Sequence, residues 1–287
     1  MSQRTWLITG VNSGFGRLMA EQLLERGDRV AGTVRKMDAV NDLKAKYAEL
    51  LWLEHLDMTD LSGIRRVVEK AFADLGRIDV IVSNAGYGLF GAAEELSDEQ
   101  VAHQLSTNLF GPIQLVRAVL PHLRAQGGGR IIGLSTYGGQ AALPGGSLYH
   151  ASKWGLEGFL DSIAQELAPF KIGVTIIEPG GARTNFRFGG GAAWHTDRSL
   201  QGHPGRDGPH NDQRHVAPSS RRSRQMVKII VDSVDQNPAP KRIALGSDSY
   251  GAIHKALTDR LSALEAQRDI ALFTDFPKDE QRAKQSA

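Results

Sequence analysis

Short runs of apolar residues recur along the chain and alternate with longer stretches in which apolar residues follow helical spacing. The runs are apolar at successive positions, which is typical of strands buried on both faces of a parallel sheet. The pattern predicts strands over residues 5–9, 29–34, 50–56, 79–83, 130–135, 171–179 and 241–245. It predicts helices over residues 15–26, 61–75, 108–124, 149–167, 225–234 and 248–268.

This alternation of strands and helices predicts an α/β fold, a Rossmann-type doubly wound parallel β-sheet of about seven strands with helices on both faces. We expect residues 1–287 to form one domain, because no linker or fixed-period repeat interrupts the pattern before residue 185. Residues 185–225 differ, since they are rich in Gly, Pro, His and Arg and poor in aliphatic residues. Such a composition buries little surface, so we expect a substrate-side loop or lid within the domain.

Composition narrows the possible partners. The formal net charge is +2, from 34 basic and 32 acidic residues, which argues against nucleic acid or a membrane surface as the main partner. The chain contains no cysteine, so disulfides and thiol nucleophiles are excluded. The sequence shows no secretory signal and no apolar run of membrane-spanning length, and we expect a cytoplasmic protein. The loop histidines lack metal-ligand spacing, and we expect no metal at His195, His203, His210 and His215.

A glycine cluster, TGVNSGFG at residues 9–16, joins the first predicted strand to the first predicted helix. Glycine permits backbone conformations and close approaches that a side chain would block. The helix that follows offers free N–H groups and the positive end of its dipole, which suit a pyrophosphate. The segment therefore predicts a dinucleotide-binding turn formed by Gly10, Asn12, Ser13, Gly14, Phe15 and Gly16.

The glycine spacing, G-x3-G-x-G, differs from the G-x-G-x-x-G of the commoner dinucleotide fingerprint. The TGxxxGxG pattern resembles the short-chain dehydrogenase/reductase family. Further motifs of that family follow in its order: SNAG at 83–86, TNLFGP at 107–112, YHASK at 149–153 and EPGGART at 178–184. The resemblance covers about residues 5–185 and implies an NAD(P)-binding domain. KRIALGSDSY near the C-terminus is similar to the branch with retinol- and 17β-hydroxysteroid-dehydrogenase-like enzymes.

The end of the second predicted strand indicates which nicotinamide cofactor binds. NAD-preferring folds place an acid about 20 residues past the glycines, to bind the ribose 2′-hydroxyl. Here Arg35 and Lys36 occupy that place, and Asp38 lies farther along, where we expect it to open the next helix. A guanidinium attracts a 2′-phosphate through charge-assisted hydrogen bonds. We therefore expect NADP(H) to be favoured over NAD(H), although Arg35 could also be a solvated charge at a strand end.

The resemblance implies further cofactor contacts. Asp57 in HLDMT would hydrogen-bond the adenine amine, although it could also serve the start of the following helix. SNAG would line the adenosine side through Asn84, Ala85 and Gly86, with Gly86 allowing close passage of the backbone. EPGGART would end a strand beside the nicotinamide, and its cofactor contacts would come from Pro179, Gly180 and Thr184.

Tyr149 and Lys153 are the candidate catalytic pair. Positions i and i+4 of a helix face the same way, so the two side chains share one space while His150 and Ser152 point elsewhere. A free tyrosine has a pKa of about 10, and a neighbouring ammonium favours the phenolate. We therefore expect Lys153 to lower the pKa of Tyr149, which allows proton transfer near neutral pH. The resemblance also implies that Lys153 holds the nicotinamide ribose.

Two more residues complete the candidate catalytic set by resemblance. The family uses a serine about 13 residues before the tyrosine to hold the substrate oxygen. That position is Thr136 here, and Ser135 precedes it. Neighbouring strand residues face opposite ways, so only one of the two is expected to reach the site, and the register favours Thr136. Asn108 matches the asparagine that holds a water linking the lysine to solvent, and it could equally mark a helix kink or cap.

The sequence therefore predicts an NADP(H)-dependent oxidoreductase that interconverts a carbonyl and a primary or secondary alcohol by hydride transfer. Tyr149 would act as its acid/base. Two alternatives keep the nucleotide: a non-enzymatic NADP-binding sensor or interaction protein, and an epimerase or dehydratase of the same family. We expect a small-molecule substrate, and the resemblance implies a homodimer or homotetramer.

Overall fold

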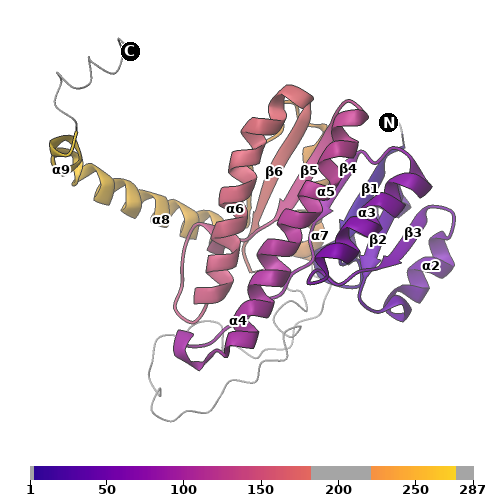
Figure 1. The fold of residues 1–287 in the computed structure, drawn as a ribbon, viewed down its shortest axis with the longest axis horizontal. Coiled ribbons are helices and arrows are strands. Elements are labelled where there is room, and N and C mark those ends of the chain that lie inside the picture. Colours follow the sequence, from indigo (N-terminus) through magenta and orange to yellow (C-terminus); the bar gives the residue numbers. More distant parts are fainter. Residues whose placement is uncertain (1–2, 182–220, 276–287) are drawn as a thin grey trace.

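The computed structural model describes residues 3–181 and 221–275 of the 287-residue chain. Its centre is a parallel sheet in the order β3-β2-β1-β4-β5-β6-β7 (Figure 1). The strands are β1 (Thr5–Thr9), β2 (Arg29–Val34), β3 (Leu51–His55), β4 (Val80–Ser83), β5 (Gly129–Leu134), β6 (Ile172–Pro179) and β7 (Arg242–Leu245). Each lies within two residues of its predicted bounds, and the predicted doubly wound sheet is confirmed.

The strands read as apolar runs because helices cover both faces of the sheet. Successive residues of β1 alternate between two buried clusters, with Trp6 and Ile8 in one and Leu7 in the other. The first cluster lies under α1 (Gly14–Glu25), α2 (Asn41–Tyr47) and α7 (Arg221–Asp232). The second lies under α3 (Leu61–Leu75), α5 (Gly111–Ala125) and α6 (Ser147–Leu167), the layer nearer the viewer in Figure 1.

Several helical segments differ from the prediction, and three of them bear on the site and the lid. The helix expected over 108–124 is α5, which begins at Gly111 because residues 106–110 form a π-helical turn. α4 (Asp98–Leu105) was not predicted, although Ser97 and Gln100 form its capping box. α7 begins at Arg221, so residues 221–225 belong to a helix rather than to the expected lid. The rest of that expected lid, residues 185–220, lies outside the described residues.

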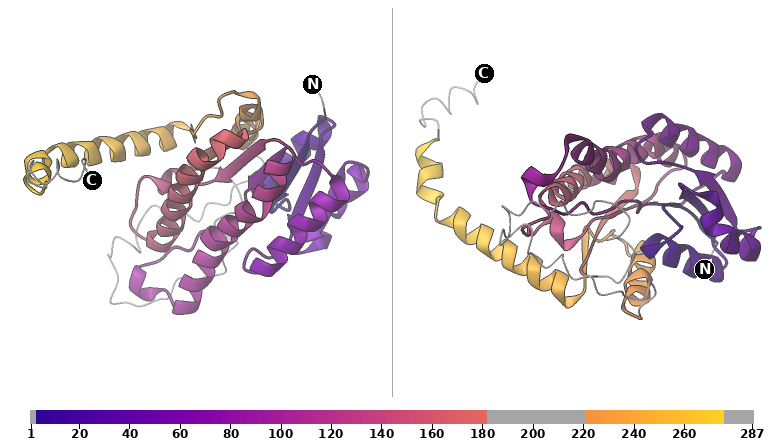
Figure 2. Two further views of the ribbon diagram at one scale, coloured as in Figure 1. Left: turned by 45° about the horizontal axis from the view of Figure 1, so that its top comes forward. Right: turned by 90° about the horizontal axis from the view of Figure 1, so that it is seen from below.

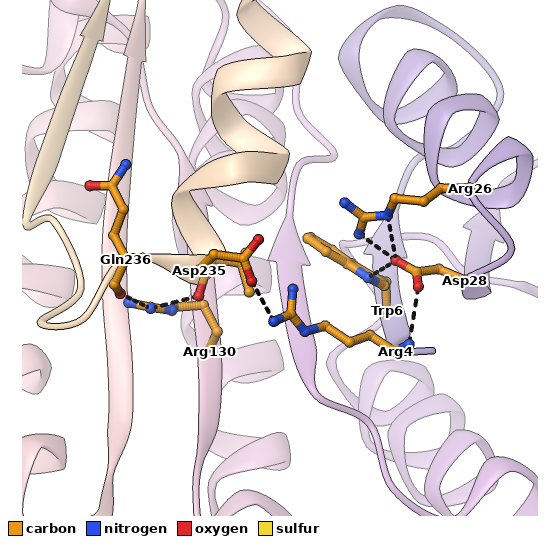
Figure 3. A network of polar contacts seen from close by, with 8 residues as sticks. Arg4, Trp6, Arg26, Asp28, Arg130, Asp235 and Gln236 are labelled. Atoms are coloured by element: carbon orange, nitrogen blue, oxygen red, sulfur yellow. Dashed lines mark hydrogen bonds and ion pairs between the residues drawn. The ribbon is translucent and has the colours of Figure 1, made fainter. Parts of the chain in front are cut away.

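A polar network links residues at the amino-terminal ends of the strands (Figure 3). The buried carboxylate of Asp28 accepts hydrogen bonds from the backbone of Arg4 and the indole of Trp6, both 3.0 Å long, and pairs with Arg26. The guanidinium of Arg4 pairs in turn with Asp235 after α7. The network lies at the end of the sheet opposite the strand carboxyl ends, so it does not occupy the end where a site would form.

The chain ends in α8 (Ser247–Glu265) and α9 (Arg268–Phe273), which extend away from the sheet (Figures 1 and 2). None of the described helices is long and apolar enough to cross a membrane.

Candidate active site

A cleft lies at the carboxyl ends of β1, β2, β4, β5 and β6. It includes the point between β1 and β4 where the strand order reverses, the usual ligand position in an open α/β sheet. Most of the sequence-predicted residues line it: Gly10, Asn12, Ser13, Gly14, Phe15, Arg35, Asp57, Asn84, Ala85, Gly86, Thr136, Tyr149, Lys153, Pro179 and Gly180. Thr184 and the loop histidines lie outside the described residues.

The glycine turn fits the pyrophosphate of a dinucleotide. Gly10 has φ +75°, a left-handed conformation that other residues adopt only with strain. A Cβ on Gly16 would lie 2.2 Å from the carbonyl oxygen of Gly10, so α1 can begin this close to the turn only with glycine there. Ser13, Gly14 and Phe15 at the start of α1 line the cleft. The turn and the helix N-terminus therefore form a cradle for an anionic group.

Asn84 holds the turn with its side chain. Its amide donates to the carbonyl oxygens of Thr9 and Gly10, at 2.8 and 3.2 Å. The hydroxyl of Thr9 accepts the backbone N–H groups of Asn84 and Ala85, each at 3.0 Å. The side-chain amide of Asn84 thus ties β4 to the glycine turn, and any contact with adenosine falls to its remaining atoms and to Ala85.

Arg35 and Asp57 lie at the nucleotide end of the cleft. Within the described residues, Arg35 forms no hydrogen bond or ion pair, so its guanidinium is available to a ligand. Burial alone would raise the pKa of Asp57, but hydrogen bonds from Thr59 and the charge of Arg35 hold it below the usual range. Asp57 closes a turn with Thr59, whereas Asp60 caps α3, so the helix-cap reading of Asp57 is wrong.

Tyr149 and Thr136 bring two hydroxyls together in the cleft. Both residues are buried, and their hydroxyls hydrogen-bond to one another. Ser135 also lines the cleft, but its hydroxyl donates to Glu157 at 2.5 Å. Both residues follow the end of β5 at Leu134, and Thr136 is the one whose hydroxyl faces Tyr149. The ring of Phe90 packs at a tilt against that of Tyr149, with centroids 5.4 Å apart.

The expected pKa shift of Tyr149 is wrong for this structure. Burial raises the pKa of Tyr149 above its ordinary value, and the hydrogen bond with Thr136 offsets only part of that rise. Lys153 does not reverse it, because its ammonium donates to the carbonyl of Leu134 at 2.8 Å. Burial also lowers the pKa of Lys153 to about 8, against the opposing charge of Glu157. The sequence showed the i, i+4 pair but not its burial.

Lys153 and Asn108 meet beside Gly86. A Cβ on Gly86 would lie 3.0 Å from Oδ1 of Asn108 and 3.8 Å from Nζ of Lys153, so glycine leaves room for both side chains. The Asn108 amide is engaged by the backbone of Tyr87, accepting from its N–H at 3.1 Å and donating to its carbonyl at 2.7 Å. Asn108 lies in the π-helical turn, which bears out the helix-kink interpretation and positions the loop after β4.

The cleft residues that the sequence reasoning did not assign to the site include Tyr87, Phe90, Tyr137 and His150. Tyr87 and Tyr137 directly follow Gly86 and Thr136, and His150 lies within YHASK, so their positions were the available signal; Phe90 had no such signal. His150 was expected to point elsewhere but lines the cleft. Its Nδ1 bonds the carbonyl of Gly138 at 2.8 Å and its Nε2 accepts the N–H of Leu143 at 3.1 Å. Burial lowers its pKa, so neutral His150 fixes the loop after Thr136.

Two buried carboxylates lie close in sequence to cleft residues. Glu157 follows Lys153 by one helical turn, and Glu178 is the next-to-last residue of β6, before Pro179. They hydrogen-bond to each other and share one guanidinium, that of Arg242, at 3.4 and 3.1 Å. Burial raises the pKa of Glu157 to about 7, and the charge of Glu178 adds to that rise. Between about pH 4.5 and 7, Glu157 therefore holds a proton that an unfolded chain would release.

The proton on Glu157 predicts a pH dependence of stability. The folded-state pKa of Glu157 lies above the ordinary 4.5, so stability is full below about pH 4.5 and falls as the pH rises to about 7. The loss is roughly 3 kcal/mol. Glu157→Gln keeps an acceptor for Ser135 without a proton to lose, so its stability should stay level over this window. Urea unfolding of both proteins at pH 5 and pH 8 measures the difference, and parallel pH dependences would contradict it.

The chain belongs to the short-chain dehydrogenase family. The family model described as short chain dehydrogenase matches residues 4–189. Members of this family are NAD(P)-dependent oxidoreductases, which agrees with the glycine turn and the Tyr149/Lys153 pair in one cleft.

Individual relatives agree with this assignment. The chain is 31% identical over 272 residues to oxidoreductase BOA17 of Botryotinia fuckeliana, covering 94% of this chain and 98% of the relative. It is 38% identical over 186 residues to a 3-ketodihydrosphingosine reductase of Bacteroides thetaiotaomicron, covering 65% and 66%.

Two solved structures share the fold. A short-chain dehydrogenase from Streptomyces avermitilis superposes with a TM-score of 0.86 at 35% identity, covering 96% of this chain and 100% of the other. A metagenomic short-chain oxidoreductase in complex with NADP superposes with a TM-score of 0.60 at 30% identity, covering 64% and 85%.

Proposed function

We propose that the protein is an NADP(H)-dependent carbonyl reductase, in which Tyr149 is the proton donor. One observation carries this proposal: the hydroxyls of Tyr149 and Thr136 meet in the cleft that also contains the glycine turn and Lys153. The relative named 3-ketodihydrosphingosine reductase, by its name a ketone reductase, supports the reaction class.

The geometry supports distinct roles for the side chains. A bound reduced nicotinamide would supply the hydride for the carbonyl carbon. Thr136 and Tyr149 would hold the carbonyl oxygen between their hydroxyls. Because burial raises its pKa, Tyr149 keeps its proton at neutral pH and can give it to the oxygen as negative charge develops there. The ammonium of Lys153 would stabilise the phenolate that remains, and Asn108 would belong to the relay that returns the proton.

Arg35 supports NADP(H) over NAD(H). Its guanidinium lines the nucleotide end of the cleft and, among the described residues, has no competing partner. The metagenomic relative binds NADP. A charge-assisted hydrogen bond from Arg35 to a 2′-phosphate would account for the preference.

Net oxidation of NADPH with a panel of ketones and aldehydes tests the proposal. A reductase converts one NADPH per alcohol formed. An epimerase or dehydratase regenerates its nicotinamide, and a sensor binds NADPH without consuming it. Stoichiometric loss of NADPH with alcohol formation supports the reductase, and binding without net oxidation across the panel would contradict it.

The adjacent hydroxyls of Ser135 and Thr136 provide a matched pair of variants. Thr136→Val keeps the branched shape and removes the hydroxyl beside Tyr149, so kcat/KM should fall about 10²-fold. Ser135→Ala leaves buried Glu157 without its donor, so we expect a stability loss of about 1–3 kcal/mol and little change in kcat. Steady-state kinetics and chemical unfolding of both variants test this, and the reverse pattern would assign the catalytic hydroxyl to Ser135.

Several predictions extend this proposal. We expect a cytoplasmic protein that forms a single domain and assembles as a homodimer or homotetramer. We expect residues 185–220 to cover the substrate, and the likeness to the retinol- and 17β-hydroxysteroid-dehydrogenase-like branch remains part of the proposal.

A further inference from the structure

The C-terminal arm, residues 247–275, contains α8 and α9 and projects from the body in every view (Figures 1 and 2). Its first turns are anchored: Ser249 and Ile253 are buried, and the Ser249 hydroxyl donates to the carbonyl of Glu178 at 2.7 Å. The guanidinium of Arg260 lies 4.9 Å from the ring centre of Trp154 on α6. Every residue from 257 to 275 is exposed. The arm thus begins on the body and then leaves it.

Large apolar side chains form a stripe along the exposed part of α8. Tyr250 is 65% exposed, Leu257 48%, Leu261 56% and Leu264 67%. Their spacing places them within about 60° of one another around the helix. We call these four residues the arm stripe. An amphipathic helix in a soluble protein normally buries such a face, so the arm stripe is expected to have a partner.

The spacing of the stripe favours a second copy of this chain as that partner. Tyr250 and Leu264, both in the arm stripe, lie seven residues on either side of Leu257, while the position that mirrors Leu261 is the anchored Ile253. The pattern therefore reads the same in both directions. When two such helices pack antiparallel about a twofold axis, Leu257 faces its own copy and Tyr250 faces Leu264. A twofold interface requires this self-complementarity, in which one patch meets itself.

Charge is consistent with this pairing and disfavours a lipid surface. In the antiparallel arrangement Arg260 lies level with His254, and Glu265 lies level with Ser249, so no two carboxylates or guanidiniums oppose each other. The polar side of α8 mixes acidic and basic residues, Lys255 among them. Helices that lie on anionic membranes instead have a polar face rich in Lys and Arg.

The exposed apolar area matches what a stable dimer requires. α9 adds Ile270, Leu272 and Phe273, which are 68%, 55% and 90% exposed, to the arm stripe. Together the seven side chains expose on the order of 800 Å², about the area that each partner gives to a standard-size interface. With the axis at Leu257, the α9 residues lie level with residues 241–244 of the second copy, so they would contact its body rather than its arm.

We propose that the arm is a dimerisation element that pairs antiparallel with the arm of a second copy, about a twofold axis at Leu257.

Light scattering coupled to size-exclusion chromatography tests the proposal on the full chain. Leu257→Glu places a charge at the centre of the interface and should raise the dissociation constant about 100-fold, which releases smaller species. Ser262→Glu adds the same charge on the opposite side of α8 and should leave assembly unchanged. A wild-type monomer at micromolar concentration would overturn the proposal, and so would a Leu257→Glu protein that assembles like the wild type.

Disulfide trapping locates the axis independently. The chain has no cysteine, so Leu257→Cys introduces the only thiol. Two such cysteines facing each other across the axis should form a covalent dimer under mild oxidation, whereas Ser262→Cys should not. Equal cross-linking at both positions would overturn the arrangement. Flotation with phosphatidylcholine/phosphatidylglycerol vesicles is expected to leave the protein unbound, and vesicle binding lost in Leu257→Glu would assign the arm to membranes instead.

Discussion

Replacing Tyr149 by phenylalanine should lower kcat for NADPH-linked carbonyl reduction by about 10²–10⁴-fold, the usual contribution of a positioned proton donor. The substitution removes only the hydroxyl that hydrogen-bonds with Thr136. The ring can still pack against Phe90, so the cleft keeps its shape and NADPH should bind with unchanged affinity. Steady-state kinetics and titration of NADPH fluorescence measure the two effects separately.

Tyr137 supplies a control for that experiment. It also lines the cleft, so Tyr137→Phe makes the same chemical change nearby and should alter kcat only a few-fold. A positioned general acid contributes at least about 10²-fold to the rate. If Tyr149→Phe kept more than about a tenth of the wild-type kcat, Tyr149 would therefore not be the proton donor.

Replacing Arg35 by aspartate should reduce or invert the preference for NADPH over NADH, changing the ratio of their kcat/KM values by on the order of 10²-fold. The variant loses the cation that would bind the 2′-phosphate. It also gains a carboxylate of the kind that accepts from the ribose 2′-hydroxyl of NAD. Since Arg35 forms no hydrogen bond or ion pair among the described residues, the substitution breaks neither. Kinetics with both cofactors measure the ratio.

Lys36→Asp is the matched control for Arg35. Lys36 is the next residue and is exposed, but it does not line the cleft. The same charge change there should shift the cofactor ratio far less. Equal shifts in both variants would show a general field effect, and an unchanged ratio in Arg35→Asp would remove the argument for phosphate recognition.

The sheet could be predicted from the sequence because its strands are buried on both faces. Residues such as Trp6, Leu7 and Ile8 contact opposite clusters in turn, so the run is apolar throughout and stands out from the helices. α4 was harder, because it is short and its only buried residue is Gln104. Its capping box at Ser97 was the signal that could have revealed it.

The sequence predicted only those features of the site that depend on the spacing of residues along the chain. The spacing from Tyr149 favoured Thr136 over Ser135, and the i, i+4 rule placed Tyr149 with Lys153. Which atoms a side chain contacts depends on neighbours distant in sequence, and so does its burial. The amide of Asn84 therefore bonds the glycine turn, and the pKa of Tyr149 is raised rather than lowered.

The central claim is that hydride passes from NADPH to a carbonyl carbon in this cleft. Reduction of a ketone found in the panel with NADPH deuterated at nicotinamide C4 tests it most directly, with the product alcohol analysed by mass spectrometry and NMR. With deuterium on the transferred face, the account predicts one deuterium on the carbinol carbon for each cofactor oxidised. Cofactor oxidation that leaves the alcohol without deuterium, using either C4 epimer, would contradict it.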